Sequence, residues 1–141
     1  MPYNLFVPGL PAPQGSKKHV GHGVMVESSK RVKPWRATVT AAIVEAGWQH
    51  DPILYGPVGV SLTFSFPRPQ AHYGTGRNAD RIKANAPDWH DKRPDVDKLC
   101  RAVLDALTES GAIRDDAQVV QLHAAKVYGQ PGVAIDVWDA S

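Results

Sequence analysis

Hydrophobic and polar positions alternate along residues 58–66 with a period of two. The apolar positions are Val58, Val60, Leu62, Phe64 and Phe66, and small or polar residues stand between them. Because successive side chains of a strand point to opposite faces, this pattern predicts a strand with one buried face. Shorter apolar runs predict strands over residues 3–7, 117–128 and 133–138, and residues 17–27 resemble a hairpin with a basic tip.

Two other segments have the period of a helix. The first can begin at Pro34 and end at Gly47, and its apolar positions are Trp35, Val39, Ala42, Ile43 and Ala46. The second can end at Gly111 and carries the stripe Val96, Leu99, Cys100, Val103, Leu104 and Leu107. The order of elements predicts one α+β domain over residues 1–141, a small mixed sheet with two main helices packed on it.

The segment between these elements, residues 67–93, has few apolar residues and many basic ones. A loop of this length in a compact domain is usually functional or disordered. Phosphates could order it, with Tyr73 and Trp89 stacking on bases, or it could be a solvated loop. With a second basic loop, residues 9–23, it holds the cations that could contact a phosphate backbone: Lys17, Lys18, Arg68, Arg77, Arg81, Lys83, Lys92 and Arg93.

The distribution of charge along the chain is more informative than the net charge. The chain of 141 residues has a net charge of +2, yet residues 1–93 hold 12 basic and 6 acidic residues, and residues 94–141 hold 4 and 8. A basic half beside an acidic half suits a protein that binds a polyanion and metal cations, although scattered surface charge gives similar counts.

Composition sets the class and the expected compartment. A hydrophobic content of 43% is typical of a globular protein, and no apolar run is long enough to span a bilayer. One cysteine, Cys100, cannot form an internal disulfide, and the first residues do not resemble a secretory signal. We therefore expect a protein of the reducing cytoplasm that has no contact with membranes, with Cys100 as a small buried hydrophobe.

Aspartates cluster at the ends of the predicted elements. Asp95 and Asp97 stand where the second helix begins, and Asp115 and Asp116 precede the next strand. Carboxylates without Cys or His among them select Mg²⁺ or Mn²⁺, and such sites cleave phosphodiesters. Helix capping, an ion pair between Asp97 and Arg101, and turn formation explain the same residues without a metal. A metal site also requires the strand to return Asp116 to the start of a helix about 20 Å long.

Three segments of the acidic half, residues 93–99 (RPDVDKL), 102–107 (AVLDAL) and 115–120 (DDAQVV), resemble the core of RusA-type Holliday junction resolvases. The resemblance is close over residues 93–126 and loose over residues 58–66. It implies a dimeric, Mg²⁺-dependent endonuclease that cuts four-way DNA junctions by paired, symmetric nicks during recombination and repair.

The resemblance also assigns roles within an acidic catalytic segment, residues 94–126. Asp95, Asp97 and Asp116 match the metal-binding aspartates, and we expect Asp115 to have a secondary role in the same site. Arg101 stands where the family has a catalytic lysine, and Lys98 where it has asparagine. Arginine can clamp a phosphate bidentately, but it cannot donate a proton as a lysine of shifted pKa can.

Lys126 matches a family lysine that lies ten residues after the last aspartate. Ten residues of strand span about 33 Å, so we expect Lys126 to contact DNA or a partner subunit rather than the metal of Asp116. Two other functions stay open at this point, a Mg²⁺-dependent nuclease for flaps or other branched DNA and a non-catalytic DNA-binding module. The expected setting is the cytoplasm of a bacterial cell, with a gene of bacterial, phage or prophage origin.

Overall fold

A computed structural model describes residues 3–15, 17–19, 25–27 and 30–141 of the chain. Its strands and helices, in chain order, are β1 (Tyr3–Pro8), β2 (Lys17–His19), β3 (Met25–Glu27), α1 (Val32–Ala46), β4 (Val58–Phe66), α2 (Val96–Glu109), β5 (Val119–Tyr128) and β6 (Gly132–Asp139). The succession of elements matches the prediction. The strand predicted from residue 117 begins at Val119 instead, because residues 116–118 form a 3₁₀ turn.

Four of the strands form one mixed sheet in the order β1-β6-β4-β5. β6 pairs antiparallel with both β1 and β4, whereas β4 and β5 are parallel. A parallel pair needs a crossover connection, and here the crossover contains residues 67–93 and α2. The remaining two strands, β2 and β3, form a separate hairpin, so the predicted α+β class with a mixed sheet is confirmed.

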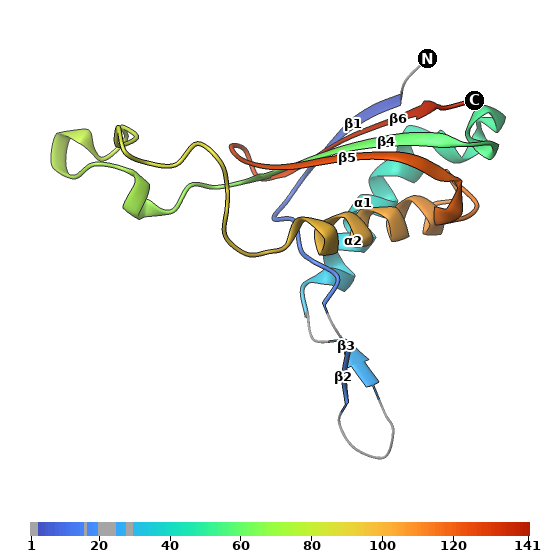
Figure 1. Cartoon of the computed structure of the whole chain (residues 1–141), viewed down its shortest axis with the longest axis horizontal. Helices are drawn as coiled ribbons and strands as arrows, with labels where there is room; N and C mark the ends of the chain where they lie inside the picture. The colour runs from blue at the N-terminus through green and yellow to red at the C-terminus, as the bar shows by residue number, and fades with distance from the viewer. Residues whose placement is uncertain (1–2, 16, 20–24, 28–29) are drawn as a thin grey trace.

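Both helices pack on one face of the sheet, and the core lies between the two layers (Figure 1). The even positions of β4 are buried, as the alternation predicts. The middle of each predicted stripe is buried as well (Trp35, Val39 and Ile43 in α1; Leu99, Cys100, Val103 and Leu107 in α2), whereas Ala46 and Val96 at the ends of the stripes are exposed. Each fully buried aliphatic or aromatic side chain of this kind stabilises the fold by about 1.5–3 kcal/mol. α1 ends at Gly47, whose φ of 79° is the left-handed conformation that glycine adopts without strain.

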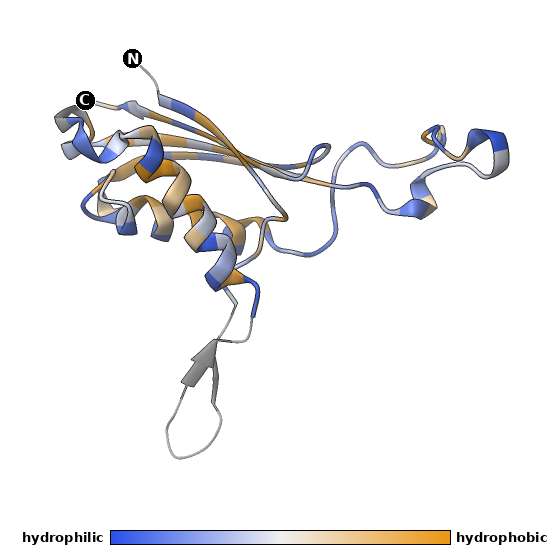
Figure 2. Ribbon diagram, turned by 180° about the vertical axis from the view of Figure 1, so that it is seen from behind, coloured by the Kyte–Doolittle hydropathy of each residue, from blue (hydrophilic) through white to orange (hydrophobic). Residues whose placement is uncertain are grey.

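Residues 67–93 form an arm that projects from the sheet (Figure 1), and its surface is mostly hydrophilic (Figure 2). The arm is held by its own hydrogen bonds, among them Gly74 N to Arg81 O at 3.0 Å and Lys83 N to His72 O at 2.8 Å. At its base, the Arg68 guanidinium donates to the Pro87 carbonyl at 2.7 Å. The predicted long loop is therefore a folded projection. Among the described residues, no helix is both long and apolar enough to cross a membrane.

Candidate functional site

The N-terminal end of α2 presents two exposed carboxylates. Asp95 has extended backbone (φ −70°, ψ 138°) and occupies the N-cap position, yet its side chain caps no N–H group. Its carboxylate instead lies 3.7 Å from the Lys98 ammonium, and Asp97 stands in the first helical turn. Neither carboxylate caps the helix. Both residues are exposed to solvent, and they are two positions apart in the chain.

The backbone that leads into Asp95 is held from two sides. The Lys126 ammonium donates to the carbonyls of Lys92 (2.5 Å) and Pro94 (2.8 Å), and the Gln14 N–H donates to the Lys98 carbonyl (3.0 Å). Lys126 is aligned with Phe64 of the parallel neighbour, whose side chain faces the core, so Lys126 points to the helix side. The Lys126 ammonium therefore has contacts within the chain, and its contact with DNA or a partner subunit stays a prediction.

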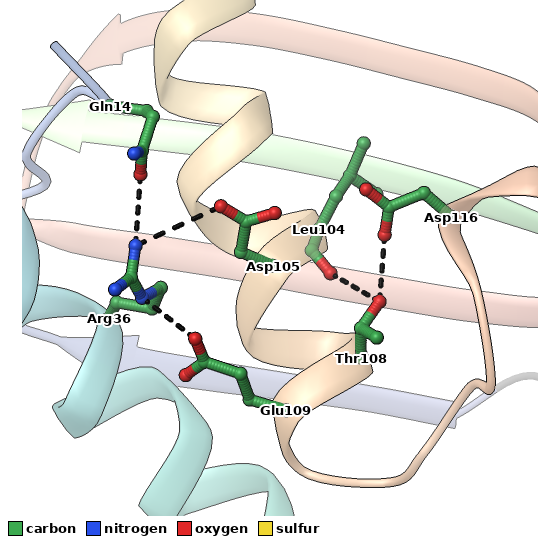
Figure 3. A network of polar contacts seen from close by, with 7 residues as sticks. All are labelled: Gln14, Arg36, Leu104, Asp105, Thr108, Glu109 and Asp116. Carbon is green, nitrogen blue, oxygen red and sulfur yellow. Dashed lines mark hydrogen bonds and ion pairs between the residues drawn. The ribbon is translucent and has the colours of Figure 1, made fainter. Parts of the chain in front are cut away.

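Asp116 lies at the opposite, C-terminal end of α2. Its carboxylate accepts a hydrogen bond of 2.7 Å from the Thr108 hydroxyl, which also lies 3.2 Å from the Leu104 carbonyl (Figure 3). The Asp115 carboxylate accepts the Ala117 N–H at 2.9 Å and caps the short turn that follows. Asp115 therefore has a structural contact of the kind that turn chemistry predicts.

An acidic hollow of about 310 Å³ opens around Asp116, and it contains a residue outside the set of predicted site residues, Asp105. Arg36 lies 3.8 Å from the Asp105 carboxylate and 3.1 Å from that of Glu109 (Figure 3). Burial raises the pKa of Asp105 and the charge of Asp116 raises it further, while Arg36 opposes both. Thr108 and Glu109 follow Asp105 by three and four residues, so the three side chains share one face of the helix. This spacing is the signal for the cluster in the sequence.

The two carboxylate groups are separated by the length of α2. Asp97 and Thr108 are eleven residues apart in one helix, which is roughly 16 Å along the axis. Oxygen ligands of Mg²⁺ lie about 2.0–2.1 Å from the ion, so Asp97 and Asp116 of one chain cannot share it. In the described part of the chain, no three His, Cys, Asp or Glu residues are grouped to hold a metal.

The expectation that one chain gathers Asp95, Asp97 and Asp116 is therefore wrong. The physical reason is topological: β5 begins beside the C-terminal end of α2, so the residues that precede it cannot reach the other end. The donor chemistry still suits a hard cation, because each end offers carboxylate oxygens. Arg101, one turn beyond Asp97, is exposed between the two groups.

The cations of the two basic loops, which are expected to contact DNA, fall into four groups. Arg77, Arg81 and Lys83 are exposed on the outer part of the arm, and Lys92 and Arg93 are exposed where the arm joins α2. Arg68 instead supports the base of the arm, because its guanidinium also lies 4.6 Å from the centre of the Tyr128 ring. The backbones of Lys17 and Lys18 lie in β2, whereas their side chains fall outside the part that the structure describes.

The buried side of α2 explains the environment of its cysteine. Cys100 is 5% exposed, as expected for a small hydrophobe. Burial raises the pKa of its thiol to about 11, and the negative charge of Asp97 contributes in the same direction. A thiol of this pKa is protonated at neutral pH, so Cys100 supplies packing to the helix rather than a nucleophile.

One family of known proteins matches the segments that carry the carboxylates and the arm. None of the curated proteins matches the chain. The profile of one protein family, described as endodeoxyribonuclease RusA, matches residues 8–138, which include both helices, the arm, β2 to β5 and nearly all of β6, but only the last residue of β1. The chain belongs to the RusA family of endodeoxyribonucleases, hydrolases that act on DNA junctions.

Proposed function

We propose that this endonuclease requires a divalent cation, Mg²⁺ or Mn²⁺, and resolves four-way junctions by paired, symmetric nicks. The observation that carries the proposal is the exposed pair Asp95 and Asp97 at the point where the basic arm rejoins α2. Hard oxygen donors beside cations suit a metal that meets phosphate oxygens. The proposed setting is recombination and repair of DNA in the bacterial cytoplasm, whether the gene is chromosomal or carried by a phage.

The enzyme we propose is a homodimer, because the two carboxylate groups of one chain lie too far apart to share an ion. A two-fold axis that sets two copies of α2 antiparallel brings Asp95 and Asp97 beside Asp116 of the partner subunit. Each dimer then has two equivalent sites, as two symmetric nicks require. Asp115, whose carboxylate already caps the adjacent turn, has a supporting role in this arrangement.

The surface between the two carboxylate groups supports such a dimer. β5 is an edge strand, and Val120 and Leu122 on it are 59% and 45% exposed. Leu122 is aligned with the buried Val60, so it points to the helix side of the sheet, next to α2. Large apolar side chains on an open strand edge are an aggregation liability unless a partner covers them.

The residues around this site have separable tasks in the proposed reaction. Asp95 and Asp97, with Asp116 of the partner subunit, would hold the cation, which would supply Lewis-acid chemistry for phosphodiester hydrolysis. Arg101 binds the scissile phosphate through its planar guanidinium. Lys126 holds the carbonyls of Lys92 and Pro94 by hydrogen bonds and so positions the Asp95 carboxylate for cation binding.

The cations outside the site hold the arms of the junction. Arg77, Arg81 and Lys83 on the arm, with Lys17 and Lys18 of the hairpin, neutralise phosphates without reading sequence. Binding should therefore weaken steeply as salt concentration rises, because each neutralised phosphate releases counterions. A flat salt response would contradict this assignment.

Incubation of the enzyme with Mg²⁺ and a synthetic four-way junction, a flap or a linear duplex tests the proposed substrate. Paired nicks near the crossover support a resolvase, flap preference assigns the activity to another branched DNA, and binding without nicking indicates a non-catalytic module. Asp97→Asn and Asp116→Asn should bind the junction and fail to cut it. Glu45→Gln, which changes an exposed carboxylate near the end of α1, is the matched control and should cut normally.

A further inference from the structure

A cavity of about 590 Å³ lies beside Asp95, at the base of the arm, and the proposed metal site and the phosphate contacts of the arm leave most of its wall without a role. Its walls come from four parts of the chain: the loop after β1, the residue before α1, the end of β4, and the segment that enters α2. The volume is within the range of about 300–1,000 Å³ that is typical of small-molecule sites. A ligand in this cavity would contact the same segment that carries the proposed catalytic site.

Much of the cavity wall is apolar. Leu10 and Pro13 line it from the loop, and Phe66 and Pro67 from the end of β4. Leu10 is 45% exposed, so the chain keeps a large aliphatic side chain accessible directly beside a charged site. Such a wall gains nothing from contact with a phosphate, but it suits the faces of a flat, weakly polar ring.

An aromatic pair completes this wall. The His90 ring stacks on Phe66 with centroids 4.5 Å apart and planes inclined by 29°. Burial lowers the pKa of His90, which favours the neutral form of its ring. Phe66 is 5% exposed, so the His90 ring is the member of the pair that a ligand can reach, and aromatic rings of this kind stack on nucleobases without regard to sequence.

The rest of the lining is cationic. Arg31 precedes α1, and Arg93 and Lys98 flank the start of α2, so the lining holds three cations and one carboxylate, that of Asp95. The N-terminal ends of both helices are at this cavity, and their free N–H groups favour an anion there. The lining thus combines a cationic edge with apolar walls.

We propose that this cavity binds one unstacked nucleotide of the DNA strand, next to the phosphate that is cut. A bare phosphodiester would use the cations and leave the apolar walls without a partner, whereas a nucleotide uses both. The inference rests on the proposed function, since it takes DNA bound at Asp95 as its premise. Unstacking one base costs a few kcal/mol, and the cost is smallest where stacking is already broken, as it is at a crossover.

A base held in this cavity also provides a way to choose the cleavage position. Contacts with the edge of the base would favour some nucleotides over others at that position, while arm contacts to phosphates do not discriminate. The cavity is therefore the part of this structure to which we assign sequence preference. Leu10 and Arg31 are its two most suitable probes, because both side chains are exposed and neither belongs to the core.

The test measures junction binding in EDTA, so that no cleavage occurs, with junctions that carry one abasic site at each crossover position in turn. An abasic site removes the base and keeps the phosphate. For the unmodified protein, we expect one position at which the abasic site weakens binding by about fivefold to tenfold, as expected for the loss of one stacked base. In Leu10→Ser, the same abasic site should weaken binding by less than about twofold, because the wall is already gone.

Matched variants separate the two halves of the proposal. Val44→Ser changes an equally exposed side chain on α1 away from the cavity and should keep the full abasic penalty. Arg31→Gln should weaken binding to intact and abasic junctions equally and lower the salt slope by about one, while Lys33→Gln should not. Circular dichroism and thermal unfolding confirm that each variant is folded.

Three results decide between the outcomes. Loss of the abasic-site penalty on binding in Leu10→Ser, but not in Val44→Ser, supports the nucleotide site. An equal penalty in the unmodified protein and Leu10→Ser, or no penalty at any position despite tight binding, overturns the nucleotide site and leaves the proposed function intact. Failure of the unmodified protein to bind the intact junction overturns the proposed function itself.

Discussion

A mixture of two inactive chains tests whether each catalytic site is built from two subunits. One chain carries Asp97→Asn and the other Asp116→Asn, at the two ends of α2 that lie roughly 16 Å apart. If each site takes Asp97 from one chain and Asp116 from the other, a mixed dimer contains one site with both aspartates and one with neither. If each site lies within one chain, both sites of the mixed dimer lack an aspartate.

The expected magnitude follows from counting sites. With equal amounts and free exchange of subunits, about half of the dimers are mixed, and each mixed dimer has one complete site of two. About a quarter of all sites are then complete, so nicking should recover to about a quarter of the rate of the unmodified enzyme. Either variant alone should stay inactive, because each of its sites lacks one ligand.

The assay uses the two variants with different affinity tags, purified in sequence so that only mixed dimers remain. These dimers should nick the junction in Mg²⁺ at about half the rate of the unmodified enzyme, and they should cut one strand without the symmetric second cut. Mixed dimers that bind the junction but never nick it would refute the shared site. A mixture of Asp97→Asn with unmodified chains controls for exchange.

Four further predictions concern single features of the fold. Lys126→Met should lower the free energy of unfolding in urea by about 1–2 kcal/mol, because it removes the charge-assisted hydrogen bonds to the backbone before α2, and should slow cleavage more than it weakens binding. With a thiol pKa of about 11, Cys100 is a thiolate in roughly one molecule in a thousand at pH 8, so a thiol reagent should modify it far more slowly in the folded than in the unfolded protein. The raised pKa of Asp105 means that wild-type stability falls as pH rises above the pKa of the unfolded chain, so Asp105→Asn should be the more stable protein in urea at pH 7 and equal to wild type near pH 3. Replacement of Arg77, Arg81 and Lys83 by Gln should lower the salt slope of junction binding by about three, and an unchanged slope would place the DNA elsewhere.

The sequence was sufficient for the elements whose periodicity is strong. The alternation in residues 58–66 and the apolar stripe of residues 96–107 correspond to β4 and α2, because both patterns reflect burial on one face only. The arm was recognisable by its length and basic composition, but its internal hydrogen bonds join residues such as His72 and Lys83 through geometry that no local pattern encodes. Turn chemistry correctly suggested a cap at Asp115.

The site was harder to predict because it depends on how distant segments meet. Local sequence cannot show at which end of α2 the chain enters β5, and this alone separates Asp116 from Asp97. The position of Lys126 could not be predicted for the same reason, because it follows from the parallel pairing of β5 with β4. Asp105 lies within the predicted second helix, yet its neighbours Arg36 and Asp116 come from other elements.

The position of β5 at the rim of the sheet has a consequence for control of the enzyme. This single strand is preceded by Asp116 at one end of α2 and supplies Lys126 at the other. Detachment of β5 would remove its ladder with β4 and disrupt both ends of α2, while β1, β6 and β4 keep their pairing. Local opening at an outer strand costs less than global unfolding. A single subunit in which β5 has detached would therefore be inactive as a nuclease. In the proposed dimer, contacts with the second subunit would hold β5 in place and so permit cleavage.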